Sequence, residues 1–384
     1  MPIVAREGAE AGPIFARVVR GDFRTLFKYA GSIVLKEYIR APIAYWILGS
    51  WFAITLAATF VFGDTLFMSV AVYSQRLRAL SIPLLALTIV SCAIFITVHR
   101  HHDETFAAAA WRYAQSLNID GSLFRLIIAC LTYVLFMGCF LYWKMKITWI
   151  HPFAWDQIFA QWDQALLGGK QAWQITTTFL ETDNDTHMLD NAYALWGLAC
   201  TLVWFSLAYS KRVPRHVRYH YWLGTLMTWI IVGLVFATVF SSAGPIYYAQ
   251  VVGDHAMFQG LRDHLAPLTD NLVARQLQII LWRVHTGEIE GVGGISAMPS
   301  MHNAQVILFV LVSLHFSPVW RVASVIFAML IFVGSMHLGW HYMVDGLASF
   351  VLVPPIWYIA GRITGSSMLP KSESTVGEPV PSRA

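Results

Sequence analysis

Residues 319–345 read VWRVASVIFAMLIFVGSMHLGWHYMVD, and they decide the fold class. The first 20 of these residues contain a single charged side chain, Arg321, and as a helix they are long enough to cross the hydrocarbon core of a bilayer. Ionisable residues follow at once, from His337 to Asp345. The stretch predicts a membrane-spanning helix with chemically capable groups at its end, since ionisable residues in or beside a span are usually functional.

The whole chain has the composition of a membrane protein. Hydrophobic residues make up 57% of its 384 residues, charged residues make up 12%, and the mean hydropathy is +0.55, whereas a soluble domain has roughly 25% charged residues. The net charge is +4, and basic residues of membrane proteins gather in cytoplasmic loops, so we expect no nucleic-acid partner. The four cysteines lie in apolar stretches without paired spacing, which is typical of reduced thiols and not of a metal site.

We predict an all-α integral membrane protein with about eight transmembrane helices, each about 20 mainly apolar residues long. The predicted spans are residues 42–62, 80–98, 123–143, 189–209, 222–242, 300–316, 319–338 and 343–361. They divide the chain into an amphipathic N-terminal segment (1–41), two accessory spans (42–122), a six-helix catalytic membrane domain (123–364) and a disordered tail (365–384). The amphipathic segment lies on anionic lipid in one interpretation and packs on the protein in the other.

The distribution of Lys and Arg predicts that both termini are cytoplasmic. With the N terminus inside, 18 of the 26 basic residues fall on the cytoplasmic side of this multi-pass chain. Two long segments then face the opposite side. Residues 152–180 are spaced for a helix that lies in the membrane interface, and residues 243–299 contain a predicted helix at 272–284.

The first candidate motif is Pro299-Ser300-Met301-His302. A serine at the start of a helix can cap it, and the free N–H groups of the first turn form a site suited to phosphate. His302 would lie in that turn. An imidazole can donate or accept a proton near neutral pH, as a general acid requires.

The second candidate motif contains His341 and Asp345. At positions i and i+4 of a helix the two side chains share a face, so the carboxylate can orient the ring. This is the arrangement of an activated nucleophile with its orienting group. His337 lies four residues before His341, and it is either a hydrogen-bonding anchor at the interface or a supporting residue of the site.

The predicted topology brings both motifs to one side of the membrane. The span at 300–316 leaves that side at His302, the next span returns to it near His337, and the last span leaves it again near His341. The motifs can therefore form a single site on the extracytoplasmic face, which is periplasmic, extracellular or lumenal.

At these residues the chain resembles the type-2 phosphatidic acid phosphatase superfamily, whose second motif is Pro-Ser-x-His and whose third ends in His-x-x-x-Asp. Within it the chain looks most like the inositol phosphorylceramide synthase (inositolphosphotransferase) branch. The similarity covers spans three to eight, and its grounds are residues 297–302, 341–345 and 162–168 together with Gly244-Pro245.

The resemblance implies roles for three residues. His341 would attack phosphorus and form a phosphohistidine, Asp345 would orient His341, and His302 would protonate the leaving group. Water or an acceptor alcohol would then take the phosphoryl group. The resemblance implies no metal and no organic cofactor.

Two departures from the family pattern concern the phosphate. The phosphatase form carries Ser-Arg seven and six positions before the nucleophilic His, where this chain has Gly334 and Ser335, so that arginine is missing. The first motif, Lys-x6-Arg-Pro, is approximated by residues 211–218, but Tyr219 replaces the proline and the topology places this loop in the cytoplasm. We interpret this loop as a positive-inside anchor.

The cation that binds the phosphate is therefore expected from the outer segments, since phosphoryl transfer relies on electrostatic stabilisation of the equatorial oxygens. The candidates are Lys170, Arg262, Arg275 and Arg283, alongside backbone N–H groups near Ser300. Gly244 and Pro245 either shape the rim of the site, where the backbone approaches a phosphate or headgroup, or form a simple re-entrant turn.

The leading hypothesis is a membrane-embedded phosphotransferase or phosphatase that acts on a phospholipid or another lipid phosphate, with a lipid alcohol as a possible acceptor. The missing arginine and the motifs shared with the inositolphosphotransferase branch favour transfer of a phospho-headgroup between lipids. The alternative in the same class is a phosphatase that hydrolyses phosphatidic acid or a related lipid. Other classes left open are a proton-coupled transporter with a His and Asp relay, and a non-catalytic scaffold.

Overall fold

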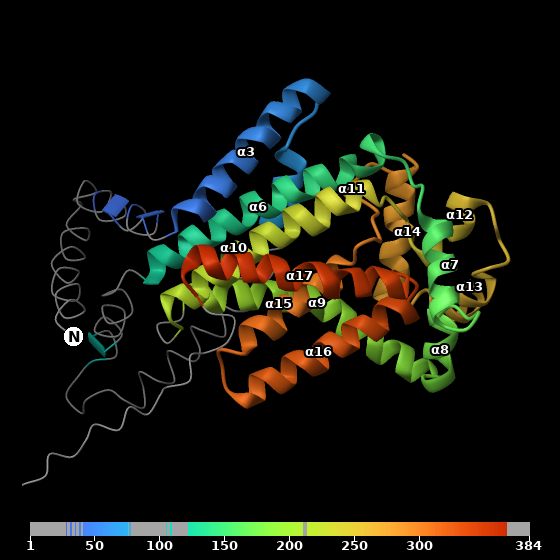
Figure 1. Cartoon of the computed structure of the whole chain (residues 1–384). Helices are drawn as coiled ribbons and strands as arrows, with labels where there is room; N and C mark the ends of the chain where they lie inside the picture. Colours follow the sequence, from blue (N-terminus) through green and yellow to red (C-terminus); the bar gives the residue numbers. More distant parts are fainter. Residues whose placement is uncertain are drawn as a thin grey trace, which may run out of the picture.

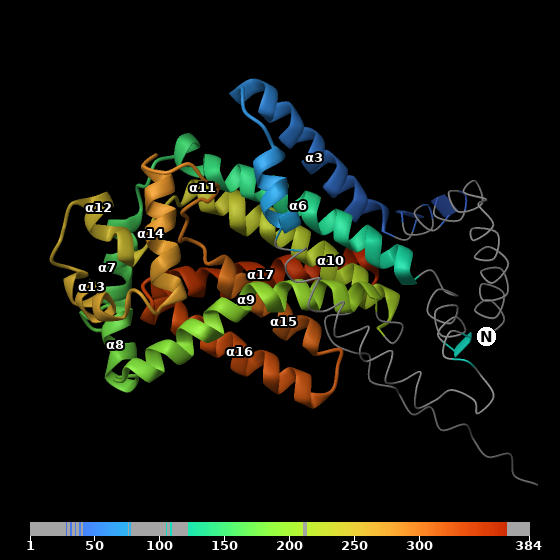
Figure 2. The same ribbon diagram turned by 180° about the vertical axis from the view of Figure 1, so that it is seen from behind.

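The computed structural model describes residues 41–75, 122–209 and 213–366, together with a few isolated positions before residue 110. These residues form helices and loops and contain no strand, which confirms the predicted fold class. The longer helices run side by side as a bundle, and shorter ones gather at one of its ends (Figures 1 and 2). The helices used below are α3 (Pro42–Phe62), α6 (Ser122–Ile150), α7 (Asp156–Leu166), α8 (Ala172–Phe179), α9 (Asp183–Tyr209), α10 (Arg215–Ile230), η1 (Ile231–Phe236), α11 (Ala237–Val239), η2 (Pro245–Tyr247), α12 (Tyr248–Val252), α13 (Gln259–Leu265), η3 (Ala266–Leu268), α14 (Val273–His285), α15 (Met301–Ser313), α16 (Pro318–His337) and α17 (Met343–Thr364).

Five helical stretches of the described chain are long and apolar enough to cross a membrane. Each coincides with a predicted span, and they are Pro42–Phe62, Arg125–Ile150, Arg215–Val239, Pro318–His337 and Met343–Thr364. The predicted spans at 189–209 and 300–316 correspond to α9, which has 27 residues, and to the short apolar α15, which has 13. The predicted span at 80–98 lies outside the described residues, as do nearly all of the N-terminal segment and of the tail.

The short helix α15 lies inside the bundle, packed against α10, α16 and α17. Glycines on two neighbouring helices allow this close packing. A Cβ atom at Gly233 would lie 2.8 Å from the sulfur of Met301, and one at Gly346 would lie 3.2 Å from the side-chain nitrogen of Asn303. Gly233 belongs to the π-helical turn η1, and such turns are frequent near functional sites.

Short helices form a cap over one end of the bundle, where α7 and α14 cross the direction of the long helices (Figure 1). The helix expected at 272–284 is confirmed by α14. The segment 152–180 forms two helices, α7 and α8, because Gly168 and Gly169 adopt positive φ values of 63° and 89° between them. Asp190 of α9 caps α14, since its carboxylate accepts the N–H groups of Val273 and Ala274, each at 2.8 Å.

Helix α3 is attached to the bundle through α6. The indole N–H of Trp143 donates to the hydroxyl of Thr55 at 2.9 Å, and the hydroxyl of Tyr142 donates to Asp64 at 2.8 Å. Asp64 also forms an ion pair with Lys146. These contacts lie near the end of α6 that reaches the cap.

Candidate active site

His341 lies two residues before α17 begins and Asp345 lies in the first turn of α17; both are buried, with 4% and 0% of their surfaces exposed. Nδ1 of His341 is 3.2 Å from Oδ2 of Asp345, and the same oxygen accepts the backbone N–H of Tyr342 at 3.0 Å. Because a carboxylate can only accept, Nδ1 of His341 donates and Nε2 keeps its lone pair. The contact expected from the i, i+4 spacing is therefore present.

The imidazole of His341 is neutral over the physiological range. Its pKa is lowered to about 3, chiefly by burial; a hydrogen bond with the backbone of Ala297 acts in the opposite direction, and the charge of Lys144 contributes to the lowering. A neutral imidazole whose Nδ1 is held by a carboxylate is able to act as a nucleophile through Nε2.

His302 lies in the first turn of α15, beside His341. The two ring centroids are 5.7 Å apart and the ring planes meet at 63°. Two aromatic residues of α9, Tyr193 and Trp196, also contact the His302 ring, each with a centroid distance of 4.4 Å. The indole N–H of Trp196 donates to the carbonyl oxygen of His302 at 3.1 Å. The fold thus brings the two sequence motifs together.

Ser300 is fully buried and connects the starts of α15 and α17. Its hydroxyl accepts the backbone N–H of Asn303 at 3.3 Å and the Asn303 side-chain amide at 3.0 Å, so the expected helix cap is present. Its own N–H donates to the carbonyl of Asp345 at 3.1 Å, and its carbonyl accepts the hydroxyl of Ser349 at 2.8 Å. The binding of phosphate by the first turn of α15 stays a prediction.

Asp163 of α7 caps α17 from a different helix. Its carboxylate accepts the N–H groups of Met343 at 2.7 Å and Val344 at 3.0 Å, two of the free donors in the first turn of α17. Burial raises the pKa of Asp163 to about 7, against the effect of these two bonds. The stretch 162–168, noted above for its family resemblance, therefore helps to fix the helix that carries Asp345.

Asp156, at the other end of α7, holds the turn at Gly244. Its carboxylate accepts the N–H groups of Ala243 and Gly244 and the hydroxyl of Tyr342, at 2.8 to 3.0 Å. Gly244 has a φ of 101°, and a Cβ atom there would lie 2.5 Å from the carbonyl oxygen of Trp340. Only glycine fits this position.

Pro245 is buried and begins the turn η2, directly after Gly244. The next residue, Ile246, donates its N–H to the carbonyl of Gly339 at 3.1 Å. The turn at Gly244-Pro245 therefore packs against the backbone just before His341, which places it in the wall of the candidate site.

Lys144 of α6 is a candidate site residue that the sequence motifs did not indicate. It lies within electrostatic reach of both His302 and His341. The loop at Gly294 packs directly on it, since a Cβ there would lie 2.6 Å from the Lys144 carbonyl oxygen. A signal existed in the sequence, because six residues separate Lys144 from His151-Pro152, which is the spacing of Lys-x6-Arg-Pro with histidine in place of arginine.

Two of the arginines predicted to bind phosphate have other partners. Arg283 is 3.4 Å from Glu288 in an exposed ion pair. Arg262 donates to the side chain of Gln259 at 2.6 Å and to the carbonyl of His255. Neither arginine has a contact with the histidine pair among the interactions of the described residues.

Arg275, Lys170 and His337 complete the predicted set. Arg275 donates to Gln278 at 2.8 Å, and Gln278 donates to the carbonyl of Leu338 at 2.9 Å, so Arg275 is linked to the turn before His341 only indirectly. Lys170 is exposed in the loop between α7 and α8.

His337 is fully buried, and hydroxyl groups lie at both of its ring nitrogens. Thr186 of α9 lies 2.9 Å from Nε2, and Thr176 of α8 lies 3.1 Å from Nδ1. With both nitrogens engaged, His337 supports the packing of α8, α9 and α16 near the site and offers no free nitrogen for chemistry.

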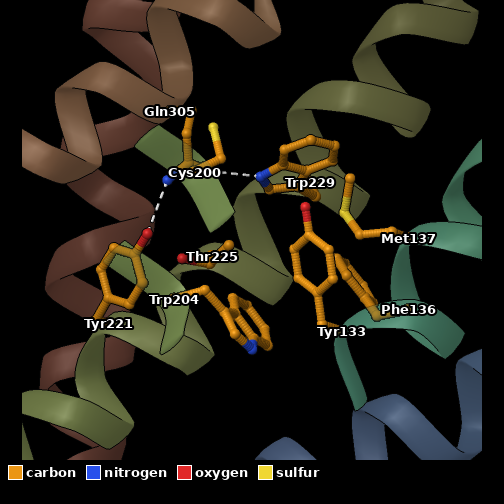
Figure 3. Close-up of a pocket in the computed structure, with 9 residues that line it drawn as sticks. All are labelled: Tyr133, Phe136, Met137, Cys200, Trp204, Tyr221, Thr225, Trp229 and Gln305. Carbon is orange, nitrogen blue, oxygen red and sulfur yellow. Dashed lines mark hydrogen bonds between the residues drawn. The ribbon is translucent and has the colours of Figure 1, made fainter. Parts of the chain in front are cut away.

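A small, mainly apolar cavity lies within the bundle (Figure 3). A single side chain, that of Trp196, lies between one of its lining residues and His302. Gln305, on α15, accepts the indole N–H of Trp229 at 2.7 Å and donates to the hydroxyl of Tyr221 at 3.0 Å. The ring of Trp196 contacts those of Trp229 and His302. The cavity is lined by Tyr133, Phe136, Met137, Cys200, Trp204, Tyr221, Thr225, Trp229 and Gln305.

A bundle of apolar helices buries a His–Asp pair near one end, with a second imidazole next to it and a half-buried lysine within electrostatic reach. These are the parts that phosphoryl transfer requires. Comparison with protein families gives the class: the family model described as the PAP2 superfamily matches residues 157–359, more than half of the chain. The protein belongs to this superfamily. No curated protein and no solved structure matches the chain.

Membership makes the protein an enzyme of the phosphatase or phosphotransferase type that acts on lipid phosphates, as the sequence motifs predicted. The match is to the superfamily and not to the inositol phosphorylceramide synthase branch. It begins in α7 and ends in α17, so α3 and α6, with Lys144, lie outside the matched region.

Proposed function

We propose that the protein transfers a phospho-headgroup between lipids through a phosphohistidine on His341. The observation that carries the proposal is the buried His341–Asp345 pair, at 3.2 Å, with the ring of His302 at 5.7 Å from that of His341. The pair supplies an oriented nucleophile, and the second imidazole is close enough to exchange a proton with a group bound between them.

In the first half-reaction, Nε2 of His341 attacks phosphorus while Asp345 holds the Nδ1 proton. A P–N bond forms, and the P–O bond to the lipid leaving group breaks. Protonated His302 delivers its proton to the leaving oxygen. In the second half-reaction the acceptor alcohol gives its proton to His302, its oxygen attacks phosphorus, and the P–N bond breaks. Water in place of the alcohol gives hydrolysis.

We propose Lys144 as the cation that balances the charge of the phosphoryl group. It lies within electrostatic reach of both imidazoles, whereas Arg262 and Arg283 are engaged elsewhere and Arg275 is linked to the site only through Gln278. A positive charge held in a buried site stabilises the transition state more than it does in water.

Two features support transfer to a lipid over hydrolysis. The nucleophile is only 4% exposed, so water has little access to it. Ser335 stands where the phosphatase form carries arginine, and it is buried, with its hydroxyl bonded to the carbonyl of Phe332 at 2.7 Å. From the Lys and Arg distribution, the site belongs on the extracytoplasmic face, with both termini in the cytoplasm.

The test supplies the purified protein with phosphatidic acid or phosphatidylinositol, with and without a lipid alcohol, and measures inorganic phosphate and new phospholipid. The proposal requires a new phospholipid that depends on the alcohol. Release of inorganic phosphate alone would leave a lipid phosphatase, the second candidate. A quench with radiolabelled substrate should trap acid-labile phosphate on the wild type and none on His341→Ala.

A further inference from the structure

The hydroxyl of Tyr193 is an unusual group in the candidate site, because it is buried and lacks a hydrogen-bond partner among the described residues. Tyr193 is 7% exposed. A buried hydroxyl without a partner destabilises a fold, since it has lost its hydrogen bonds to water and gained none in return. Such a group calls for a physical reason for its presence.

The surroundings of Tyr193 place the phenol in the site. Its ring stacks on that of His302, at 4.4 Å between centroids and 30° between planes. It lies nearly parallel to Trp340, at 8° and 6.3 Å, one residue before His341. The charge of Asp345 also acts on the phenol. Two ring contacts and the electrostatic effect of Asp345 therefore place Tyr193 next to the histidine pair.

The ring also packs next to Gly334 of α16. A Cβ atom at Gly334 would lie 3.5 Å from Cδ2 of Tyr193, in van der Waals contact. Gly334 occupies the position of the serine in the Ser-Arg pair of the phosphatase form, and Ser335 occupies that of the arginine. In this chain the ring of Tyr193 therefore lies next to the position at which the phosphatase form carries its arginine. A phenol can donate one hydrogen bond to an anionic oxygen but brings no charge.

We propose that the Tyr193 hydroxyl donates a hydrogen bond to the phosphoryl group of the substrate, and so acts as a catalytic residue on a helix that carries none of the three motifs. This inference rests on the function proposed above. It explains the unpartnered hydroxyl, since the partner arrives with the substrate. It also supplies a neutral donor in a site whose described cation is Lys144.

The test compares Tyr193→Phe with Tyr133→Phe. Tyr193→Phe keeps the stacking on His302 and removes only the oxygen, so kcat for the lipid substrate should fall by about 10- to 100-fold, the effect of one hydrogen bond to a charged group. Its thermal midpoint should stay the same or rise. Tyr133 is equally buried, but its hydroxyl bonds to Thr201 at 3.2 Å outside the site, so Tyr133→Phe should lower the thermal midpoint and leave kcat unchanged.

Binding of inorganic vanadate, which mimics a five-coordinate phosphoryl group, gives a second measurement. Tyr193→Phe should weaken vanadate binding by a similar factor, and Tyr133→Phe should not. Wild-type kcat and vanadate affinity in Tyr193→Phe would overturn the role of Tyr193 and leave the proposed function intact. A wild-type protein that neither turns over lipid phosphates nor binds vanadate would overturn both.

Discussion

Lys144 and Lys146 lie two positions apart on α6 and face different surroundings. Lys144 acts on the two imidazoles, whereas Lys146 pairs with Asp64 after α3. Lys144→Met is expected to lower kcat/KM by at least about 100-fold, because it removes the charge that balances the phosphoryl group. Lys146→Met should cost no more than about 1 kcal/mol of stability and leave turnover within a few-fold of wild type, since its ion pair is partly exposed. Equal losses of turnover in the two variants would contradict the assignment.

The lowered pKa of His341 has a consequence for stability. The folded protein binds a proton there only near pH 3, whereas an unfolded histidine has a pKa of about 6.5. Between these values the unfolded state binds more protons, so the free energy of unfolding falls as the pH decreases from about 6.5. Thermal unfolding at pH 7, 6 and 5 should show a steeper loss in wild type than in His341→Gln, approaching about 1.4 kcal/mol per pH unit. Parallel curves would show that burial of His341 does not contribute.

At the scale of residues, the sequence predicted which histidine and aspartate side chains come together and did not point to Lys144. The proximity of His302, His341 and Asp345 could be predicted because two of them are four residues apart and an even number of apolar stretches separates them from the third. Lys144 could not be separated from Lys146 in this way. Which lysine faces the site depends on how α6 is rotated against the loop at Gly294, and this is set by tertiary packing.

At the scale of elements, the cap that Asp163 provides for α17 can be compared with the cap that Asp190 provides for α14. Asp163→Ala removes the acceptor for two N–H groups of the helix that carries Asp345, and Asp190→Ala removes the equivalent cap of α14. Both variants should lose about 1 to 2 kcal/mol of stability. Only Asp163→Ala is expected to lower kcat strongly, by displacing the His341–Asp345 pair. Similar kcat values in the two variants would argue against this coupling.

The long apolar helices followed from hydropathy alone, because a span must satisfy its backbone hydrogen bonds internally and needs about 20 apolar residues. Two features of the elements did not follow. The division of residues 152–180 into α7 and α8 depends on the backbone of Gly168-Gly169, and the π-helical turn η1 reflects packing of Gly233 against Met301. Both are tertiary effects on local structure.

At the scale of the whole molecule, Gln305 ties α10 to α15 inside the bundle. Gln305→Leu leaves the indole of Trp229 and the hydroxyl of Tyr221 without this partner, and each buried group then costs about 1 to 3 kcal/mol. A marked drop in the thermal midpoint is expected. Thr228→Val is the control, because the Thr228 hydroxyl is fully buried and has no partner in the described part of the chain, so its removal should leave the midpoint unchanged or raise it. A midpoint lowered equally by both would contradict a stabilising role for the Gln305 bonds.

Helix α7 has only 11 residues, yet its two buried carboxylates secure both the turn at Gly244 and the start of α17. A substitution survey that scores activity alone would therefore report Asp156 and Asp163 as catalytic, although each is bonded to backbone groups and neither is placed in the proposed reaction. Sorting such a survey by protein abundance as well as by product formed would separate residues that shape the site from those that perform the reaction.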